Sequence, residues 1–270
     1  MKIAFSTLGC PDWSWNEMTA AAKDLGYDGV ELRAVEGELY LPQARIFTPG
    51  LIAETMAALA RRRLAVSCLA SSCCLHVVGH GEERLREGLD YIDLAARLGA
   101  PYVRVLGDKA PQPTGNVDDG LVAKGLRTLG EAAAARGVTV LIETNGAFAD
   151  TKRLRRVVES SGGKGIGVLW DVHHPFRFAG ESFQQSWDAL GEFVRYLHLK
   201  DSVFAEGRVR YRFLGDGDLP FGELASVLRA GGFDGWVSLE WVKLWEPDLE
   251  EPGVVFPHFI QEFKRVFGAE

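Results

Sequence analysis

Four side chains of metal-ligand type each follow a short apolar run that predicts a β-strand. They are Glu143 after residues 138–142, Asp171 after 166–170, His198 after 195–197 and Glu240 after 236–239. In a parallel barrel the carboxyl ends of the strands converge on one mouth, so residues far apart in sequence can meet there. The pattern therefore predicts one metal site formed by these four residues.

Three carboxylates and one imidazole give a mainly oxygen donor set. This set suits one divalent ion, with Mn²⁺ preferred and Mg²⁺, Co²⁺ or Zn²⁺ as alternatives. A sugar or another hydroxy-ketone would chelate such an ion, which would stabilise the enediolate formed by proton removal. Glu143 and Glu240 follow well-separated strands, so they are the predicted catalytic acid and base. A single acidic residue at a strand end is most often a solvated loop residue or a helix cap, so the hypothesis rests on all four positions together.

The elements that must position these residues alternate along the whole chain. Apolar runs and helical patterns follow one another eight times, which is typical of βα units in a parallel sheet. Strands are predicted at residues 3–7, 29–33, 65–70, 102–106, 138–142, 167–170, 195–199 and 236–239. Helices are predicted at 15–25, 49–63, 82–98, 117–136, 151–160, 183–192, 221–230 and 256–267. Because no linker interrupts this alternation, we expect an α/β protein with one domain over residues 1–270, a single (β/α)8 TIM barrel.

Glycines support this partition. Gly26, Gly99, Gly137 and Gly231 each follow a predicted helix, where a left-handed residue commonly ends the helix. The long loops at 71–81, 107–116 and 202–220 should line the mouth of the barrel.

Composition argues against two classes of partner. The net charge of −7 disfavours binding to a nucleic-acid backbone, which requires clustered Lys and Arg. The basic run at 61–63 is interpreted as a helix end, where cations interact favourably with the helix dipole. No apolar run approaches the length of a membrane span, so no membrane partner is expected. The four cysteines lack paired CxxC spacing, which favours free thiols in a cytoplasmic protein.

Six motifs, in this order and spacing, resemble the xylose isomerase-like TIM barrel superfamily of sugar phosphate isomerases and epimerases, which also contains endonuclease IV. The motifs are Gly26-Tyr-Asp-Gly-Val-Glu31, Ile142-Glu-Thr-Asn145, Asp171-Val-His-His174-Pro, His198-Leu-Lys-Asp201, Leu214-Gly-Asp-Gly-Asp218 and Gly232-Phe-Asp-Gly-Trp-Val-Ser-Leu-Glu240. The resemblance spans nearly the whole chain. It places the family's metal ligands on Glu143, Asp171, His198 and Glu240, with the two glutamates also transferring protons.

The resemblance also assigns residues around the metal. It implies that His174 contacts a substrate oxygen and that Lys200 and Asp201 orient the site. Lys200 is also a candidate for contact with the substrate. His173 has no counterpart and is interpreted as a packing residue. The relatives that epimerise free ketoses at carbon 3 carry a glutamate and an arginine where this chain has Ala149 and Phe204. These departures count against a simple free-ketose epimerase.

Further candidates for substrate binding come from the residues themselves. Arg104 lies inside a predicted strand and needs an anionic partner, either a substrate acid group or a helix carboxylate. Trp13 is predicted to cover one face of a bound ring, whereas Trp15 is expected to pack. His76 and His80 lie in a predicted mouth loop, and their place in the site stays open. The arginines at 208, 210 and 212 would share one face of a hairpin, more typical of a solvated edge than of an acid-binding site.

The predicted function is therefore a metal-dependent isomerase or epimerase of a small hydroxy-ketone. The alternative is a dehydratase of inosose or 3-dehydroshikimate type, which begins with the same proton removal. An endonuclease IV-like nuclease is disfavoured, because residues 208–213 lack the Asp-x-His pair of that enzyme and the chain is acidic. The partner is a small molecule, and the resemblance implies a homodimer.

Overall fold

The computed structural model describes residues 1–76, 81–113 and 115–268. Eight parallel strands form a closed barrel in the order β1-β10-β7-β6-β5-β4-β3-β2. The fold is therefore a (β/α)8 TIM barrel, which confirms the predicted fold class. By their internal contacts, residues group into two compact units, 1–65 with 198–270 (unit 1) and 66–197 (unit 2).

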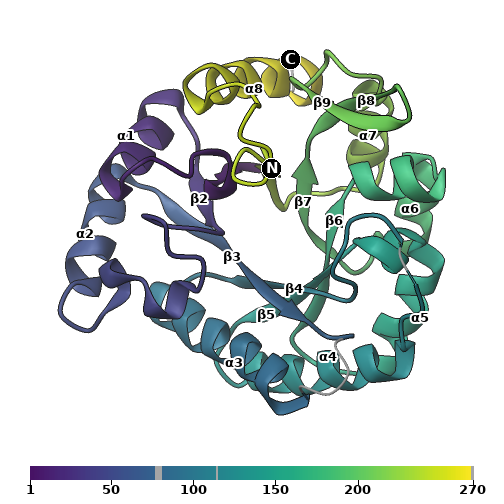
Figure 1. Ribbon diagram of the computed structural model, residues 1–270, viewed down its shortest axis with the longest axis horizontal. Coiled ribbons are helices and arrows are strands. Elements are labelled where there is room, and N and C mark those ends of the chain that lie inside the picture. Colours follow the sequence, from purple (N-terminus) through teal and green to yellow (C-terminus); the bar gives the residue numbers. More distant parts are fainter. Residues whose placement is uncertain (77–80, 114, 269–270) are drawn as a thin grey trace. The chain divides into compact units, whose positions relative to one another are not determined.

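Unit 1 is built from both ends of the chain. Its first strand, β1, pairs with β2 on one side and with β10 on the other, so that Phe5 lies opposite Val30 and Leu239. Figure 1 shows α1 and α2 beside β2. The elements of unit 1 are β1 (Lys2–Ser6), α1 (Trp15–Leu25), β2 (Gly29–Leu32), α2 (Ile52–Arg62), β8 (Asp201–Ala205), β9 (Arg208–Arg212), α7 (Phe221–Ala230), β10 (Trp236–Leu239) and α8 (Pro252–Phe267).

Unit 2 contains the central strands. β4 pairs with β5 and β5 with β6, and α3, α4 and α5 cover the outside of these strands (Figure 1). Its elements are β3 (Ala65–Cys74), α3 (Gly81–Leu98), β4 (Tyr102–Leu106), α4 (Asp119–Ala134), β5 (Thr139–Glu143), α5 (Thr151–Ser161), β6 (Ile166–Asp171), α6 (Phe183–Leu190) and β7 (Val194–Leu199), whose last two residues belong to unit 1. Val140, Leu141 and Ile142 are all fully buried, as expected for a strand covered on both faces.

Three of the four glycines predicted to end helices adopt the left-handed conformation. Gly26, Gly99 and Gly137 have φ of 81°, 66° and 70°, which confirms the predicted left-handed positions. The prediction for Gly231 is wrong, because its φ is −78° and the next residue, Gly232, adopts the left-handed conformation at 66°. The glycine pair allows the turn to form one residue later.

A β-hairpin and a π-helix are among the described elements that were not in the predicted set. The loop after β7 forms an antiparallel hairpin of β8 and β9, in which Asp201 pairs with Arg212. The segment Pro175–Ala179 forms a π-helix directly after the histidine pair at 173–174. π-Helices are rare and occur frequently at functional sites.

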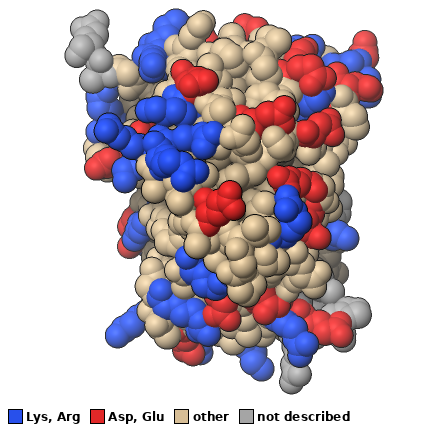
Figure 2. Space-filling model, turned by 90° about the vertical axis from the view of Figure 1, so that its left-hand side faces the viewer, with Lys and Arg blue, Asp and Glu red and all other residues tan. Residues whose placement is uncertain are grey.

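The basic run at 61–63 ends α2, as predicted. Arg63 caps the helix with φ of 56°, and Arg62 donates to Asn16 Oδ1 at 2.5 Å. Figure 2 shows one face of the molecule, where Lys and Arg side chains gather with Asp and Glu side chains beside them. Among the described residues, no helix is long and apolar enough to cross a membrane.

Candidate metal centre

Two predicted ligands lie at the ends of neighbouring strands in unit 2. Glu143 is the last residue of β5 and Asp171 the last residue of β6, and the two strands are parallel. Both carboxylates are buried, with 3% of Glu143 and none of Asp171 exposed. Buried carboxylates require cations or hydrogen-bond donors, which the surrounding residues supply.

Arg104 provides the cation for Glu143. Its Nε lies 3.1 Å from Glu143 Oε2, and Nη1 donates to the backbone oxygen of Ser71 at 2.8 Å. This anionic partner stands on the adjacent strand β5. A role of Arg104 in binding substrate stays a prediction.

Asp171 is held by the residues that follow it. Its Oδ1 accepts a hydrogen bond from the backbone N–H of His173 at 3.0 Å, and its Oδ2 lies 3.6 Å from His174 Nε2. The other ring nitrogen of His174, Nδ1, lies 2.9 Å from the oxygen of Thr144, which can only accept. His174 thus donates from Nδ1, and a neutral ring presents the Nε2 lone pair to Asp171.

His173 also lies close to Asp171. It is fully buried and packs edge-on against Phe178, which agrees with its predicted packing role. Asp171, His173 and His174 nevertheless offer ligand atoms that all lie within 4.8 Å of one another. This buried acidic and histidine cluster suits a divalent metal.

The other two predicted ligands lie in unit 1. His198 is buried near the end of β7, and Glu240 directly follows β10, where its N–H donates to Leu199 O at 3.0 Å. The buried Lys200 forms an ion pair with Glu240 Oε2. Lys200 thus supports a predicted ligand, and its contact with a substrate stays a prediction.

Glu31 is a functional candidate to which the sequence assigned no role. Its Oε2 lies 2.7 Å from His198 Nε2, and both side chains are almost completely buried. Because Nε2 donates to Glu31, a neutral ring presents the Nδ1 lone pair to Glu240 Oε1, 3.4 Å away. Two acceptors facing each other in this way suit a cation between them. The only sequence signal was the position of Glu31 at the end of a motif.

The charges of these buried residues also indicate which kind of ligand they could bind. In unit 2 the carboxylates of Glu143 and Asp171 accompany the cation Arg104. In unit 1 those of Glu31 and Glu240 accompany Lys200. The buried Arg33 is a further cation of unit 1. Groups of buried carboxylates and imidazoles of this kind fit a divalent cation.

Asp201 has a structural role next to Lys200. Its carboxylate accepts hydrogen bonds from the backbone N–H groups of Ser202, Gly215 and Gly217 at 2.8–2.9 Å. Burial raises the pKa of Asp201, and these hydrogen bonds counteract the rise. Asp201 thus holds the loop after β9 in place. These contacts are consistent with the orienting role that the resemblance implies.

The aromatic and basic residues of unit 1 that could contact a substrate differ in their burial and in their neighbours. Trp13 is half-buried and meets Phe256 edge-on, so its contact with a substrate stays a prediction, whereas Trp15 is buried as expected. Arg33, which the sequence did not single out, is buried with its guanidinium 5.6 Å from the ring of Trp245. Phe204 is 64% exposed on the hairpin.

The remaining candidates are at the surface or outside the described residues. Arg208 and Arg212 are exposed, and Arg210 forms an ion pair with Glu206, as expected for a solvated edge. His76 accepts a hydrogen bond from Asp118 N–H at 3.2 Å, and His80 lies outside the described residues.

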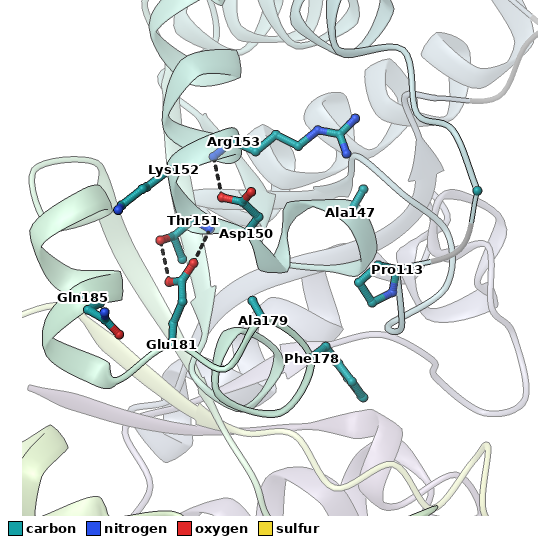
Figure 3. A pocket seen from close by; sticks show the side chains of 11 residues that line it. Pro113, Ala147, Asp150, Thr151, Lys152, Arg153, Phe178, Ala179, Glu181 and Gln185 are labelled. Atoms are coloured by element: carbon teal, nitrogen blue, oxygen red, sulfur yellow. Dashed lines mark hydrogen bonds between the residues drawn. The ribbon is translucent and has the colours of Figure 1, made fainter.

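A cavity of about 510 Å³ opens in unit 2 beside the start of α5. Figure 3 shows Glu181 hydrogen-bonded to Thr151, with Lys152 and Gln185 on one side of the cavity and Pro113 and Phe178 on the other. The residues that line it include none of the predicted site residues. The ring of Phe178 also lies 5.8 Å from that of His174.

Comparison with known proteins gives a match to one protein family. The family model described as xylose isomerase-like TIM barrel matches residues 19–253. An inosose dehydratase of Geobacillus thermodenitrificans (strain NG80-2) is 27% identical over 152 residues, which are 50% of this chain and 50% of that protein. The chain therefore matches about half the length of that curated relative.

Solved structures show the same fold over the whole chain. The probable 3-DHS dehydratase AsbF of Bacillus anthracis has a TM-score of 0.80 at 14% identity, covering 98% of this chain and 99% of that chain. A D-psicose 3-epimerase of Clostridium cellulolyticum H10, solved with D-tagatose, has a TM-score of 0.80 at 15% identity and full coverage of both chains, 100% and 100%. A protein of Mycobacterium smegmatis in complex with magnesium has a TM-score of 0.76 at 17% identity, covering 99% and 96%.

Proposed function

The chain belongs to the xylose isomerase-like TIM barrel family, and we propose that it is a divalent-metal-dependent isomerase or epimerase of a small polyhydroxylated ketone. The observation that carries this proposal is the presence, in each unit, of a group of buried carboxylates and imidazoles at or near strand ends. In each group, carboxylate and imidazole acceptors face one another at 3.4–3.6 Å. A divalent cation would accept lone pairs from both partners of such a pair.

We infer that Glu143, Asp171, His198 and Glu240 hold this cation. The four residues end or follow β5, β6, β7 and β10, which are consecutive in the barrel. Their mainly oxygen donor set favours Mn²⁺ or Mg²⁺ over the softer Zn²⁺. When bound, the ion supplies a Lewis acid that polarises a substrate carbonyl and makes the neighbouring C–H group acidic.

The chain's own residues would then move the proton. One of the two glutamates, Glu143 or Glu240, removes it from the carbon and the other returns a proton. Arg104 and Lys200 keep the two carboxylates in fixed orientations through their ion pairs. We propose that His174 contacts a substrate oxygen; the contact of its Nδ1 with Thr144 O at 2.9 Å supports this role by holding the ring.

A dehydratase of inosose or 3-dehydroshikimate type is the second candidate. The match with an inosose dehydratase over half the chain favours it. Two departures from the free-ketose 3-epimerases also support a different substrate. Where those enzymes carry a glutamate and an arginine, this chain has Ala149, which is fully buried, and Phe204, which is exposed on the hairpin. This reaction begins with the same proton removal and continues with loss of a hydroxyl group as water.

Solvent-deuterium exchange separates the two reactions. Metal-free protein is reloaded with Mn²⁺, Mg²⁺, Co²⁺ or Zn²⁺ and incubated with ketoses, inososes and 3-dehydroshikimate in D₂O. Deuterium in an isomerised product supports the first candidate, and a dehydrated product supports the second. Glu143→Gln should abolish exchange, and Glu54→Gln on the exposed side of α2 is the matched control. Unchanged exchange in Glu143→Gln would refute the mechanism.

A further inference from the structure

The strand β2 carries none of the four proposed ligands, yet its third residue, Glu31, bears an almost completely buried carboxylate. Glu31 stands opposite Ser6 in the pairing of β1 with β2, and its side chain is 1% exposed. A buried carboxylate has a large desolvation cost. Its hydrogen bond to His198 at 2.7 Å shows how part of that cost is offset.

We propose that Glu31 is the positioning residue that selects which nitrogen of His198 binds the metal. This inference rests on the proposed function. The carboxylate has no hydrogen to donate at neutral pH, so the hydrogen in the contact must reside on Nε2. Nε2 is then excluded as a metal ligand, and Nδ1 is the nitrogen left to bind the ion.

The position of Nδ1 agrees with this assignment. It lies 3.4 Å from Glu240 Oε1, the carboxylate of another proposed ligand. A carboxylate on the far nitrogen also makes the ring a stronger base, and partners of this kind typically contribute 10- to 100-fold to metal affinity. Lys200 completes the arrangement by holding the second oxygen of Glu240.

Metal affinity tests the proposal without any substrate. Calorimetric titration of metal-free protein with Mn²⁺ should give a dissociation constant about 10- to 100-fold higher in Glu31→Ala than in the wild type. Glu31→Gln, which keeps the size and one acceptor oxygen, should fall between them. Glu54→Gln, an identical change at an exposed position of the same unit, should match the wild type.

A second measurement follows the hydrogen bond itself. In ¹H–¹⁵N spectra of metal-free protein, the wild type should show a slowly exchanging Nε2–H proton of His198, assigned by its absence in His198→Gln. This signal should lose its protection in Glu31→Ala, whatever the charge of the ring. If Glu31→Ala does not fold, the metal affinity of Glu31→Gln decides.

The outcomes separate this inference from the proposed function. Wild-type affinity in both Glu31 variants, or an unprotected Nε2–H in the wild type, would overturn the role of Glu31 and leave the proposed enzyme intact. A wild type that binds none of the four ions would overturn the proposed function. The Nε2–H signal would then still show whether Glu31 holds His198.

Discussion

Three of the four proposed metal ligands are held by a neighbouring side chain that is not itself a proposed metal ligand. Glu31 holds His198, Lys200 holds Glu240 and Arg104 holds Glu143. Residues locked in this way lose little conformational freedom when a ligand arrives. The surrounding shell thus contributes to affinity by preparing the site before binding.

Removing one of these neighbours should destabilise the metal-free protein strongly. Lys200→Met keeps most of the side-chain volume but leaves Glu240 buried without its cation. We expect the free energy of unfolding to fall by about 3–5 kcal/mol, the usual effect of breaking a buried ion pair. Urea denaturation measures the change. Lys124→Met at an exposed position of α4 should change stability by less than about 0.5 kcal/mol, and an equal effect of both substitutions would contradict the role of Lys200.

A buried tyrosine should limit stability at alkaline pH. Tyr27 donates to Phe256 O at 2.9 Å, and burial raises its pKa well above the ordinary value. Its neutral form is favoured in the folded state, so its contribution is complete below about pH 10 and is lost as the pH rises through the folded-state pKa. Tyr27→Phe should lower the free energy of unfolding by about 1 kcal/mol at neutral pH. Above about pH 10 its stability should fall less steeply than that of the wild type, and parallel curves would refute the argument.

At the scale of elements, the hairpin of β8 and β9 depends on one carboxylate. The carboxylate of Asp201 accepts hydrogen bonds from three backbone N–H groups, those of Ser202 in β8 and of Gly215 and Gly217 in the loop after β9. The loop passes so close to this side chain that a Cβ atom at Gly217 would lie 2.0 Å from Asp201 Oδ1. A glycine is therefore required at this position by contact distance.

Two alanine substitutions test this requirement. Gly217→Ala should lower the free energy of unfolding by about 2 kcal/mol, because the methyl group forces Asp201 or its loop to move. Gly222→Ala in α7 is the control, since no atom lies within 4 Å of its Cβ position and alanine favours a helix by up to about 1 kcal/mol. Denaturant midpoints measured together distinguish the two effects. A neutral Gly217→Ala would show that the loop has room to adjust.

Elements with local end signals could be predicted from the sequence at their observed bounds. Helix α1 begins at a capping box of Ser14 and Glu17 and ends at the left-handed Gly26, and its predicted range is correct. The strand ends that carry Glu143 and Asp171 were predicted within one residue for the same kind of reason, since each closes an apolar run.

Features that depend on distant residues could not be predicted in this way. The π-helix at Pro175–Ala179 has no local signal, and Phe178 in it packs against both His173 and His174. The partner of Arg104 and the link between Glu31 and His198 join residues 39 and 167 positions apart, as their numbers show. Sequence periodicity specifies the elements but not such pairs.

For the molecule as a whole, the bound ion should be a measurable part of stability. Metal at 100 times its dissociation constant should raise the free energy of unfolding by about 2.7 kcal/mol, because the unfolded chain lacks the site. Thermal melts with added Mn²⁺ and with a chelator measure this shift. Asp171→Asn and His198→Gln should abolish it, whereas Glu54→Gln should keep it. A shift that survives both ligand substitutions would place the ion elsewhere.

The division of unit 1 between the two ends of the chain has a consequence for biosynthesis. β1 cannot meet its partner β10 until the ribosome has reached residue 236, because Lys2 pairs with Trp236. At about 5–20 residues per second, the first strands wait on the order of ten seconds or more for this partner. Unit 2, by contrast, is continuous in sequence and is complete at residue 197. We therefore expect the nascent N-terminal strands to remain without this partner throughout most of synthesis, when chaperones would protect them.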